Sequence, residues 1–316
     1  MKKIPKVAIV TRTKDRPILL ERAIKSVEAQ TFSDYVHVIF NDGGSRRQVE
    51  RVVERVSKDT QKRIQLIHNE VSQGLTPSLN KAIMGCDSEY VTILDDDDTW
   101  HKDRLKKTIS FLDNSDQKVV IVKMDIIIED ITENGIKKIS QELHPQSGEG
   151  EISLYKQCHR NYLSNGIITY HRNIYDELGG YDESLETAED WDFGIRLMLE
   201  YDVAFLRDEE SLFFYHQRPS SKGDEGNSGL AKVYIQERTL NKIRNKYLRE
   251  DIKKGRFGVG YIMNAVVTDE TLVRRLEGHT SHVGEQIKET VRDTVENANY
   301  IYRIKKRIIG QRKNNS

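Results

Sequence analysis

The chain has 316 residues, and its 50 basic and 50 acidic side chains give a formal net charge of zero. A chain of this length can bury one large core plus an appendage, and its neutrality gives no electrostatic reason to expect a nucleic acid partner. The two cysteines, Cys86 and Cys158, lack the paired spacing of a disulfide framework or a zinc site. No apolar run approaches the ~20 residues that span a bilayer, and no signal peptide is recognisable, so a cytoplasmic location is expected.

The first hundred residues alternate between short apolar runs and amphipathic segments. Strands are predicted at residues 6–11, 35–40, 64–67 and 91–94, and helices at residues 18–31, 48–58 and 76–84. The resulting β-α-β-α-β-α-β order predicts the α/β class, with a Rossmann-like, mainly parallel sheet and helices on both faces.

The fourth predicted strand ends in four consecutive acids, residues 95–98. Adjacent carboxylates repel one another unless a cation or water neutralises them, and their oxygens are the hard ligands that Mg²⁺ and Mn²⁺ prefer. Because the carboxyl ends of parallel strands meet at one edge, residues 11–16, 41–44 and 95–98 should converge on one crevice. The alternative is a solvated acidic turn. No glycine-rich phosphate loop follows the first strand, so a nucleotide would be held by side chains and a metal.

An ordered set of motifs resembles a family 2 glycosyltransferase with the GT-A fold, of the kind that builds bacterial cell-surface polysaccharides or glycoconjugates. The motifs are VTRTKDRP at 10–17, FNDGG at 40–44, Asn69, Gly74, Asn80, LDDDDTW at 94–100, LGGYDE at 178–183 and EDWD at 189–192. Each motif is weak alone, but the ordered set is a strong signal, and the resemblance covers residues 4 to about 220. The NDGG sequence departs from the more usual DDGS but keeps the aspartate that meets the nucleobase in this family.

The resemblance implies a donor site for a nucleotide-diphospho-sugar, with a UDP-sugar favoured. Asp95 would meet the ribose or the metal, Asp97 would ligate Mn²⁺ or Mg²⁺, and His216 would complete the metal shell. The donor-nucleotide contacts that the resemblance implies are Thr11, Arg16, Asp42, Asp95 and Asp96. The basic loop that follows the strand at residue 213 is expected to add Arg218. Arg16 in a surface ion pair and His216 as a structural histidine are the alternatives.

The second half of the chain should provide the acceptor site. Strands are predicted at residues 119–124, 126–128 and 165–170, and an aromatic strand begins at residue 213. A polar and mobile loop is predicted at 142–151, and helices at 174–178 and from 186. The resemblance implies that Asp190 is the general base and that Glu189 orients the sugar or the acceptor, although acids also favour a helix N-terminus for electrostatic reasons alone. Trp191 is either part of the core, the more common place for such a residue, or a stacking platform for the acceptor.

The expected domain boundary lies at a charged, glycine-rich stretch near residue 224. Residues 1–224 form the predicted glycosyltransferase domain, with a nucleotide-sugar half to about 100 and an acceptor half from 101, and residues 225–316 form a helical extension. A basic loop with Arg218 and Lys222 could close over a diphosphate. After Glu296 the tail has basic residues and no acid. Three interpretations are open: a solvated helix end, peripheral contact with anionic membrane lipid, or a surface that binds a partner, such as a second copy of the chain.

The sequence thus predicts an inverting, metal-dependent hexosyl- or N-acetylhexosaminyl-transferase. Its donor would be a nucleotide-diphospho-sugar, its cofactor Mn²⁺ or Mg²⁺, and its acceptor a hydroxyl of a glycan or lipid-linked glycan. The enzyme would be cytoplasmic, either free or bound peripherally to the inner face of the membrane. Transfer to a polyprenyl phosphate is one alternative, and a non-catalytic nucleotide-sugar or glycan-binding protein is the other.

Overall fold

The computed structural model describes residues 4–133, 135–221, 226 and 233–264. The chain divides into two compact units, residues 1–260 and 261–316, and the first unit contains every element discussed below. Within the described ranges, no helix is long and apolar enough to cross a membrane.

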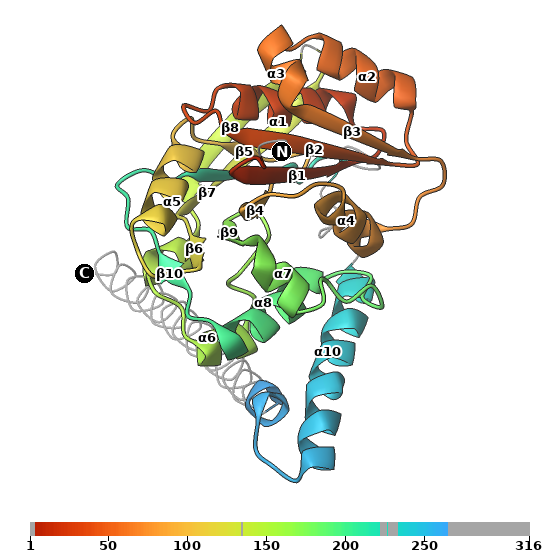
Figure 1. Cartoon of the computed structure of the whole chain (residues 1–316). Helices are drawn as coiled ribbons and strands as arrows, with labels where there is room; N and C mark the ends of the chain where they lie inside the picture. Colours follow the sequence, from red (N-terminus) through yellow and green to blue (C-terminus); the bar gives the residue numbers. More distant parts are fainter. Residues whose placement is uncertain (1–3, 134, 222–225, 227–232, 265–316) are drawn as a thin grey trace, which may run out of the picture. The chain divides into compact units, whose positions relative to one another are not determined.

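The first sheet has seven strands in the order β10-β6-β9-β4-β1-β2-β3 (Figure 1). These strands are β1 Val7–Thr13, β2 Tyr35–Asp42, β3 Ile64–Asn69, β4 Tyr90–Ile93, β6 Val119–Ile121, β9 Ile168–His171 and β10 Ala204–Phe205. Strand β1 pairs in parallel with β2 and β4, and β2 pairs in parallel with β3. The predicted parallel arrangement is therefore confirmed. The carboxyl ends of β1, β2 and β4 lie at one edge, as the predicted crevice requires.

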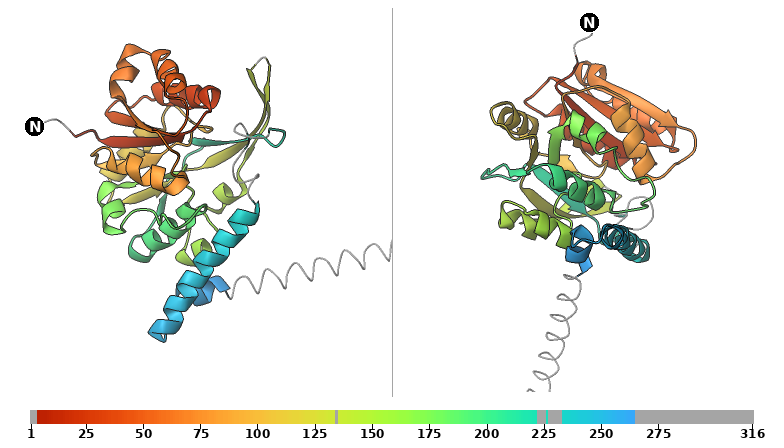
Figure 2. Two further views of the ribbon diagram at one scale, coloured as in Figure 1. Left: turned by 90° about the vertical axis from the view of Figure 1, so that its right-hand side faces the viewer. Right: turned by 60° about the horizontal axis from the view of Figure 1, so that its bottom comes forward.

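The second sheet has four strands in the order β5-β11-β7-β8. They are β5 Thr99–Trp100, β7 Met124–Thr132, β8 Gly135–Leu143 and β11 Phe213–Gln217. The β7–β8 hairpin is the yellow-green pair of strands at the upper right in the left view of Figure 2. Strand β8 was not predicted, and the loop expected from residue 142 begins inside it and continues as the 3₁₀ helix η1 Pro145–Glu149. As an edge strand, β8 is largely exposed, so it lacks the apolar alternation that reveals a buried strand.

Helices cover both faces of the first sheet (Figure 1). The helices of the fold, not all of which lie on this sheet, are α1 Pro17–Glu28, α2 Arg46–Glu54, α3 Lys58–Arg63, α4 Leu75–Met84, α5 Arg104–Asp113, α6 Leu154–His159, α7 Arg172–Glu177, α8 Glu189–Glu200 and α10 Val233–Lys254. In β2, Ile39 packs with α1 and α2, whereas Val38 and Phe40 belong to the cluster that includes α4, because alternate side chains of a strand face opposite ways. The helix predicted at residues 48–58 is α2, which ends earlier, at Glu54; a second helix that was not predicted, α3, follows it, with Ser57 as its cap accepting from the Thr60 N–H.

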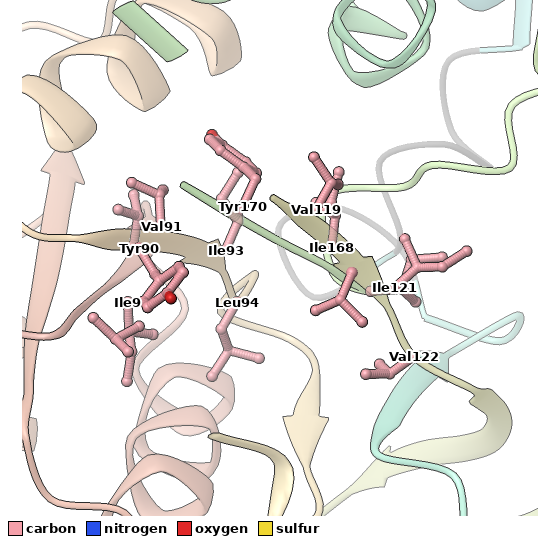
Figure 3. Packing of buried hydrophobic residues seen from close by; sticks show 14 of the residues in the cluster. Ile9, Tyr90, Val91, Ile93, Leu94, Val119, Ile121, Val122, Ile168 and Tyr170 are labelled. Atoms are coloured by element: carbon pink, nitrogen blue, oxygen red, sulfur yellow. The ribbon is translucent and has the colours of Figure 1, made fainter. Parts of the chain in front are cut away.

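The core joins the two halves of the chain. Figure 3 shows side chains of β4 (Val91, Ile93), β6 (Val119, Ile121) and β9 (Ile168) packed side by side. Strand β9 pairs antiparallel with both β4 and β6, so it inserts between strands of the donor and acceptor halves. This shared core fixes the end of β4, and thus the acidic residues, against the second half of the chain.

Helix α10 docks on the start of α8. Lys246 lies 2.9 Å from carboxylate oxygens of both Asp182 and Asp192, and the Tyr247 hydroxyl lies 3.2 Å from Asp192. These contacts lie within the first compact unit, which comprises residues 1–260. The part of the predicted helical extension after residue 264, with the basic tail, lies outside the described residues.

Candidate active site

Arg12, at the end of β1, connects the acids of β4 with the acids of α8. Its Nη2 lies 3.1 Å from Asp95 Oδ1, and its Nη1 lies 3.5 Å from Glu189 Oε1. The same Nη1 donates to the carbonyl oxygen of Leu75, at the first turn of α4, at 2.8 Å. The predicted donor and acceptor motifs therefore face one guanidinium group. Sequence reasoning had not assigned a role to Arg12, although its place in the first motif, at a strand end, is a detectable signal.

The second acid of the run is held inside the protein. Asp96 accepts from the Thr13 hydroxyl at 2.8 Å and from Arg16 Nη1 at 2.9 Å, so both of its oxygens have partners. Burial raises the pKa of Asp96; the positive charge of Arg16 opposes this shift, and the negative charge of Asp97 adds to it.

Thr11 is fully buried and its hydroxyl lies 2.8 Å from His37 Nε2. Because β1 continues to Thr13, the hydroxyl that reaches the strand end is that of Thr13.

Asp42, at the end of β2, organises the loop that precedes α4. Its carboxylate accepts from the Gln73 and Gly74 N–H groups at 2.9 and 3.0 Å, and from the Ser72 hydroxyl at 2.8 Å. Asn69 also donates to it, at 3.2 Å. Burial alone would raise the pKa of Asp42, but the hydrogen bonds from Gln73 and Ser72 lower it below the ordinary value. Asp42 is thus ionised and lies at the predicted edge, with its oxygens engaged by the loop.

Asp97 belongs to a buried ionic cluster that spans both sheets. Its Oδ2 lies 2.5 Å from Arg218 Nη2 and 3.5 Å from Arg16 Nη1. Arg218 is fully buried, and its Nη1 donates to Glu129 Oε1 of β7 at 3.0 Å. Arg22, on α1, lies 2.6 Å from the other oxygen of Glu129. Burial would raise the pKa of Glu129, but His216 and Arg22 lower it to about 2.

His216 lies in this cluster with both ring nitrogens engaged. Its Nδ1 is 2.7 Å from Glu129 Oε2, and its Nε2 is 2.8 Å from the Thr99 hydroxyl. Its backbone N–H donates to Asp98 Oδ1 at 2.9 Å. Burial lowers the pKa of the imidazole, although the hydrogen bond to Glu129 opposes this shift. A carboxylate on one ring nitrogen is typical of histidines that bind metal through the other, which here faces Thr99.

The acceptor motif places two acids at the first turn of α8. Ala188, just before them, adopts a left-handed conformation with φ 55°, which is costly for a residue with a Cβ and is found mostly at functional sites. Burial raises the pKa of Asp190, and the neighbouring charge of Glu189 raises it further. Glu189 Oε1 lies 3.5 Å from Asn165 Nδ2, and Asn165 in turn accepts from the Tyr181 hydroxyl at 2.9 Å.

Trp191 follows these acids but points into the core. Its side chain is 2% exposed, and the indole N–H donates to the carbonyl oxygen of Gln157, on α6, at 2.6 Å. A buried indole with its one donor satisfied cannot serve as a stacking platform in this conformation. The geometry therefore favours the core alternative for Trp191 over the acceptor role.

The carboxylate oxygens of Asp95 and Asp97, after β4, could supply some of the ligands of a hard divalent cation. Asp95 has a 36% exposed side chain, and both ion pairs of Asp97 described above involve Oδ2. Among the residues that the structure describes, no group of three His, Cys, Asp or Glu side chains is arranged to hold a metal. Proteins usually hold Mg²⁺ through only one or two carboxylates, however, and substrate phosphate and water fill the remaining coordination positions.

Comparison with known proteins decides the family. The family model for glycosyl transferase family 2 matches residues 8–179, more than half of the chain. The chain belongs to glycosyl transferase family 2. It is similar to WcaA of Escherichia coli K12, provisionally named a colanic acid biosynthesis glycosyl transferase, with 30% identity over 201 residues, or 64% of this chain and 69% of WcaA. This chain is therefore a glycosyltransferase, as the motifs predicted.

Two solved structures of similar fold confirm the GT-A architecture of this glycosyltransferase. One is S. aureus TarS 1-349 in complex with UDP-GlcNAc, with a TM-score of 0.56 and 18% identity over 77% of this chain and 66% of that chain. The other is the mannosyltransferase PcManGT from Pyrobaculum calidifontis in complex with GDP-Man and Mn²⁺, with a TM-score of 0.56 and 16% identity over 78% and 65%. This chain spans just under two thirds of each, and at these identities the likeness concerns the fold.

Proposed function

We propose that this glycosyltransferase moves a sugar, with inversion, from a nucleotide-diphospho-sugar to a hydroxyl of a glycan or glycoconjugate. The observation that carries the proposal is the double contact of Arg12, which brings Asp95 and the Glu189–Asp190 pair to one crevice. A donor held at the end of β4 would present its anomeric carbon toward the acids of α8. Proximity of this kind is a large part of the catalysis of a two-substrate transfer.

Asp190 is the proposed general base. Its raised pKa makes it a better proton acceptor than an ordinary carboxylate at neutral pH. It would take the proton from the acceptor hydroxyl as that oxygen attacks the anomeric carbon and the nucleoside diphosphate leaves from the opposite side. Glu189, which contacts Arg12 and Asn165, would orient the sugar or the acceptor. The attack from one side and departure from the other would invert the anomeric configuration.

Asp95 and Asp97 would hold the proposed Mn²⁺ or Mg²⁺ ion. The cation would act as a Lewis acid for the charge on the departing diphosphate. Arg16 and Arg218 lie beside these carboxylates, and their positive charges would help to offset the charge of the departing diphosphate. Asp42, Asp95, Asp96 and Thr13 lie at the ends of β1, β2 and β4, where the nucleoside would bind.

The two structures of similar fold contain UDP-GlcNAc and GDP-Man. Asn41 stands where the usual motif has an aspartate, so the identity of the nucleobase is not decided by the motif. The proposed donor is therefore a UDP-sugar, with a GDP-sugar as the alternative. A lipid-linked glycan as the acceptor is supported by the name of a similar Campylobacter jejuni protein, GalNAc(5)-diNAcBac-PP-undecaprenol beta-1,3-glucosyltransferase, which is 34% identical over 95 residues. A peripheral position on the inner face of the membrane, with contact or homo-oligomerisation through residues 230–316, is proposed from the basic tail.

A hydrolysis screen tests this function. Purified protein is incubated with UDP- and GDP-sugars in the presence of Mn²⁺, Mg²⁺ or excess chelator, and release of the nucleoside diphosphate is measured. Turnover of one donor that depends on the cation and is lost in Asp97→Asn would support the proposal. Binding of nucleotide sugars without turnover, even with candidate glycan acceptors, would favour a non-catalytic binding protein.

A further inference from the structure

The carboxylate of Glu129, on β7, is bound by three side chains from two other parts of the fold: Arg22 of α1, and His216 and Arg218 at the end of β11. Its side chain is 2% exposed, with Oε1 3.0 Å from Arg218 and Oε2 2.6 Å from Arg22 and 2.7 Å from His216 Nδ1. We propose that Glu129 is a positioning residue, which holds Arg218 and His216 for the donor diphosphate and its cation. This inference rests on the proposed function of the same site.

Glu129 lies on the buried face of β7. Ile127 and Glu129 are buried, whereas Ile128 and Asp130 are half-buried, because alternate side chains of a strand face opposite ways. The register with β8 shifts between Ile128, opposite Ser140, and Glu129, opposite Lys138, so the extra residue at this irregularity belongs to β8. A buried carboxylate is costly unless it is fully paired, and Glu129 is paired through both oxygens.

Arg218 gives Glu129 its functional importance, because this guanidinium bridges two acids. Its Nη1 contacts Glu129, and its Nη2 contacts Asp97 Oδ2 at 2.5 Å. When Asp97 turns to a cation, Arg218 must release that oxygen. With Glu129 in place, Arg218 keeps a carboxylate partner and remains beside Asp97, where its positive charge would help to offset that of the donor diphosphate. Without the charge of Glu129, Arg218 would pair more strongly with Asp97 and compete with the cation.

The alternative is that Glu129 only holds the two sheets together. This alternative predicts lower thermal stability without a specific change in ligand affinity. The two roles are separated by Glu129→Gln, which keeps size and one acceptor oxygen but removes the charge. The control is Asp113→Asn, which removes a carboxylate that contacts Lys6 at 2.9 Å and the Tyr90 hydroxyl at 2.7 Å, outside the cluster.

The measurements are melting temperature, calorimetric binding of Mn²⁺ with UDP or GDP, and donor hydrolysis as a function of donor and Mn²⁺ concentration. Glu129→Gln should bind Mn²⁺–nucleoside diphosphate about 10–100-fold more weakly, the usual effect of losing a group that orients a ligand to a metal. It should raise the donor KM and the half-saturating Mn²⁺ concentration more than it lowers kcat. Asp113→Asn should keep the wild-type affinity even where it lowers the melting temperature.

A double variant tests whether Glu129 acts through Arg218. Glu129→Gln should add less than about threefold to the loss of affinity of Arg218→Gln, because residues that act through one another are not additive. Fully additive losses, or unchanged affinity in folded Glu129→Gln, would overturn the inference while leaving the proposed function intact. Wild-type protein that binds neither nucleoside diphosphate overturns both. If Glu129→Gln does not fold, Glu129→Asp replaces it: the shorter side chain withdraws the carboxylate from Arg218 and His216, so weaker binding of Mn²⁺–nucleoside diphosphate is again expected, and unchanged affinity overturns the inference.

Discussion

Asp190→Asn is the substitution that tests the proposed mechanism most directly. Asparagine has nearly the same shape, and its oxygen can still accept the hydrogen bond that the Trp191 N–H donates to Asp190 Oδ1 at 2.9 Å. The amide cannot take a proton from an acceptor hydroxyl. Transfer should therefore fall by roughly 10²–10⁴-fold, the usual contribution of general base catalysis. The donor-binding side chains lie on other elements, so affinity for the donor should stay near that of the wild type.

The same substitution should not destabilise the protein. The pKa of Asp190 is raised from 3.8 to about 7, chiefly by burial and then by Glu189. A raised pKa in the folded state means that stability is lost as the pH rises from the ordinary carboxyl range to about 7. Ionised Asp190 therefore costs folding free energy at neutral pH, at roughly 1.4 kcal/mol for each unit by which its pKa is raised. Asparagine, which carries no charge, should leave the melting temperature equal or higher.

The assay is single-turnover transfer at saturating donor, with melting temperature measured in parallel. For the wild type, kcat/KM should rise with pH through about 7, because only the ionised carboxylate accepts a proton. Glu189→Gln is the matched control and should affect acceptor KM more than the chemical step. Wild-type transfer by Asp190→Asn together with an inactive Glu189→Gln would assign the base to Glu189. Normal transfer by both variants would refute the assignment of this acid pair.

Three further predictions concern the metal, the nucleoside and the tail. Asp97→Ala should abolish metal-dependent donor turnover in a folded protein, and full wild-type activity in excess chelator would contradict the metal assignment. Asp42→Ala should weaken calorimetric binding of nucleoside diphosphate by about 1–3 kcal/mol, the usual cost of losing a hydrogen bond to a charged group, and unchanged affinity for every nucleoside diphosphate would reject this role. Truncation after about residue 299 should reduce binding to anionic liposomes, and binding of the intact protein should weaken with salt. Failure of the intact protein to bind at low salt would favour a partner surface or a solvated helix.

The donor half of the fold was readable from the sequence because its signals are local. Each buried strand of a parallel sheet is an apolar run, and each run here ends in polar residues that the chain order places at one edge. The four strands, the parallel order and the position of the acids after β4 were predicted in this way. The boundaries were less accurate, as the extension of β1 to Thr13 shows, because strand ends depend on pairing with the neighbouring strand.

Other features could be decided only by the tertiary structure. Edge strand β8 and helix α3 depend on exposure and on a single cap, neither of which alters the apolar pattern enough to be detected. Trp191 could have been core or platform, and only its neighbours show that it is buried. The sequence predicts helix α10 within the helical extension, but only its contacts with Asp182 and Asp192 show where it docks.

The amino-acid sequence by itself determined the family, the donor-side strands and the identity of the acids at their ends. The tertiary structure decided which charges meet. Arg12 contacts a glutamate 177 positions later, and Arg218 contacts an aspartate 121 positions earlier. Glu129, in the middle of β7, gains its partners from α1 and from the end of β11. No local pattern encodes such pairs, because the cost of burying each charge is met only when a distant part of the chain folds against it.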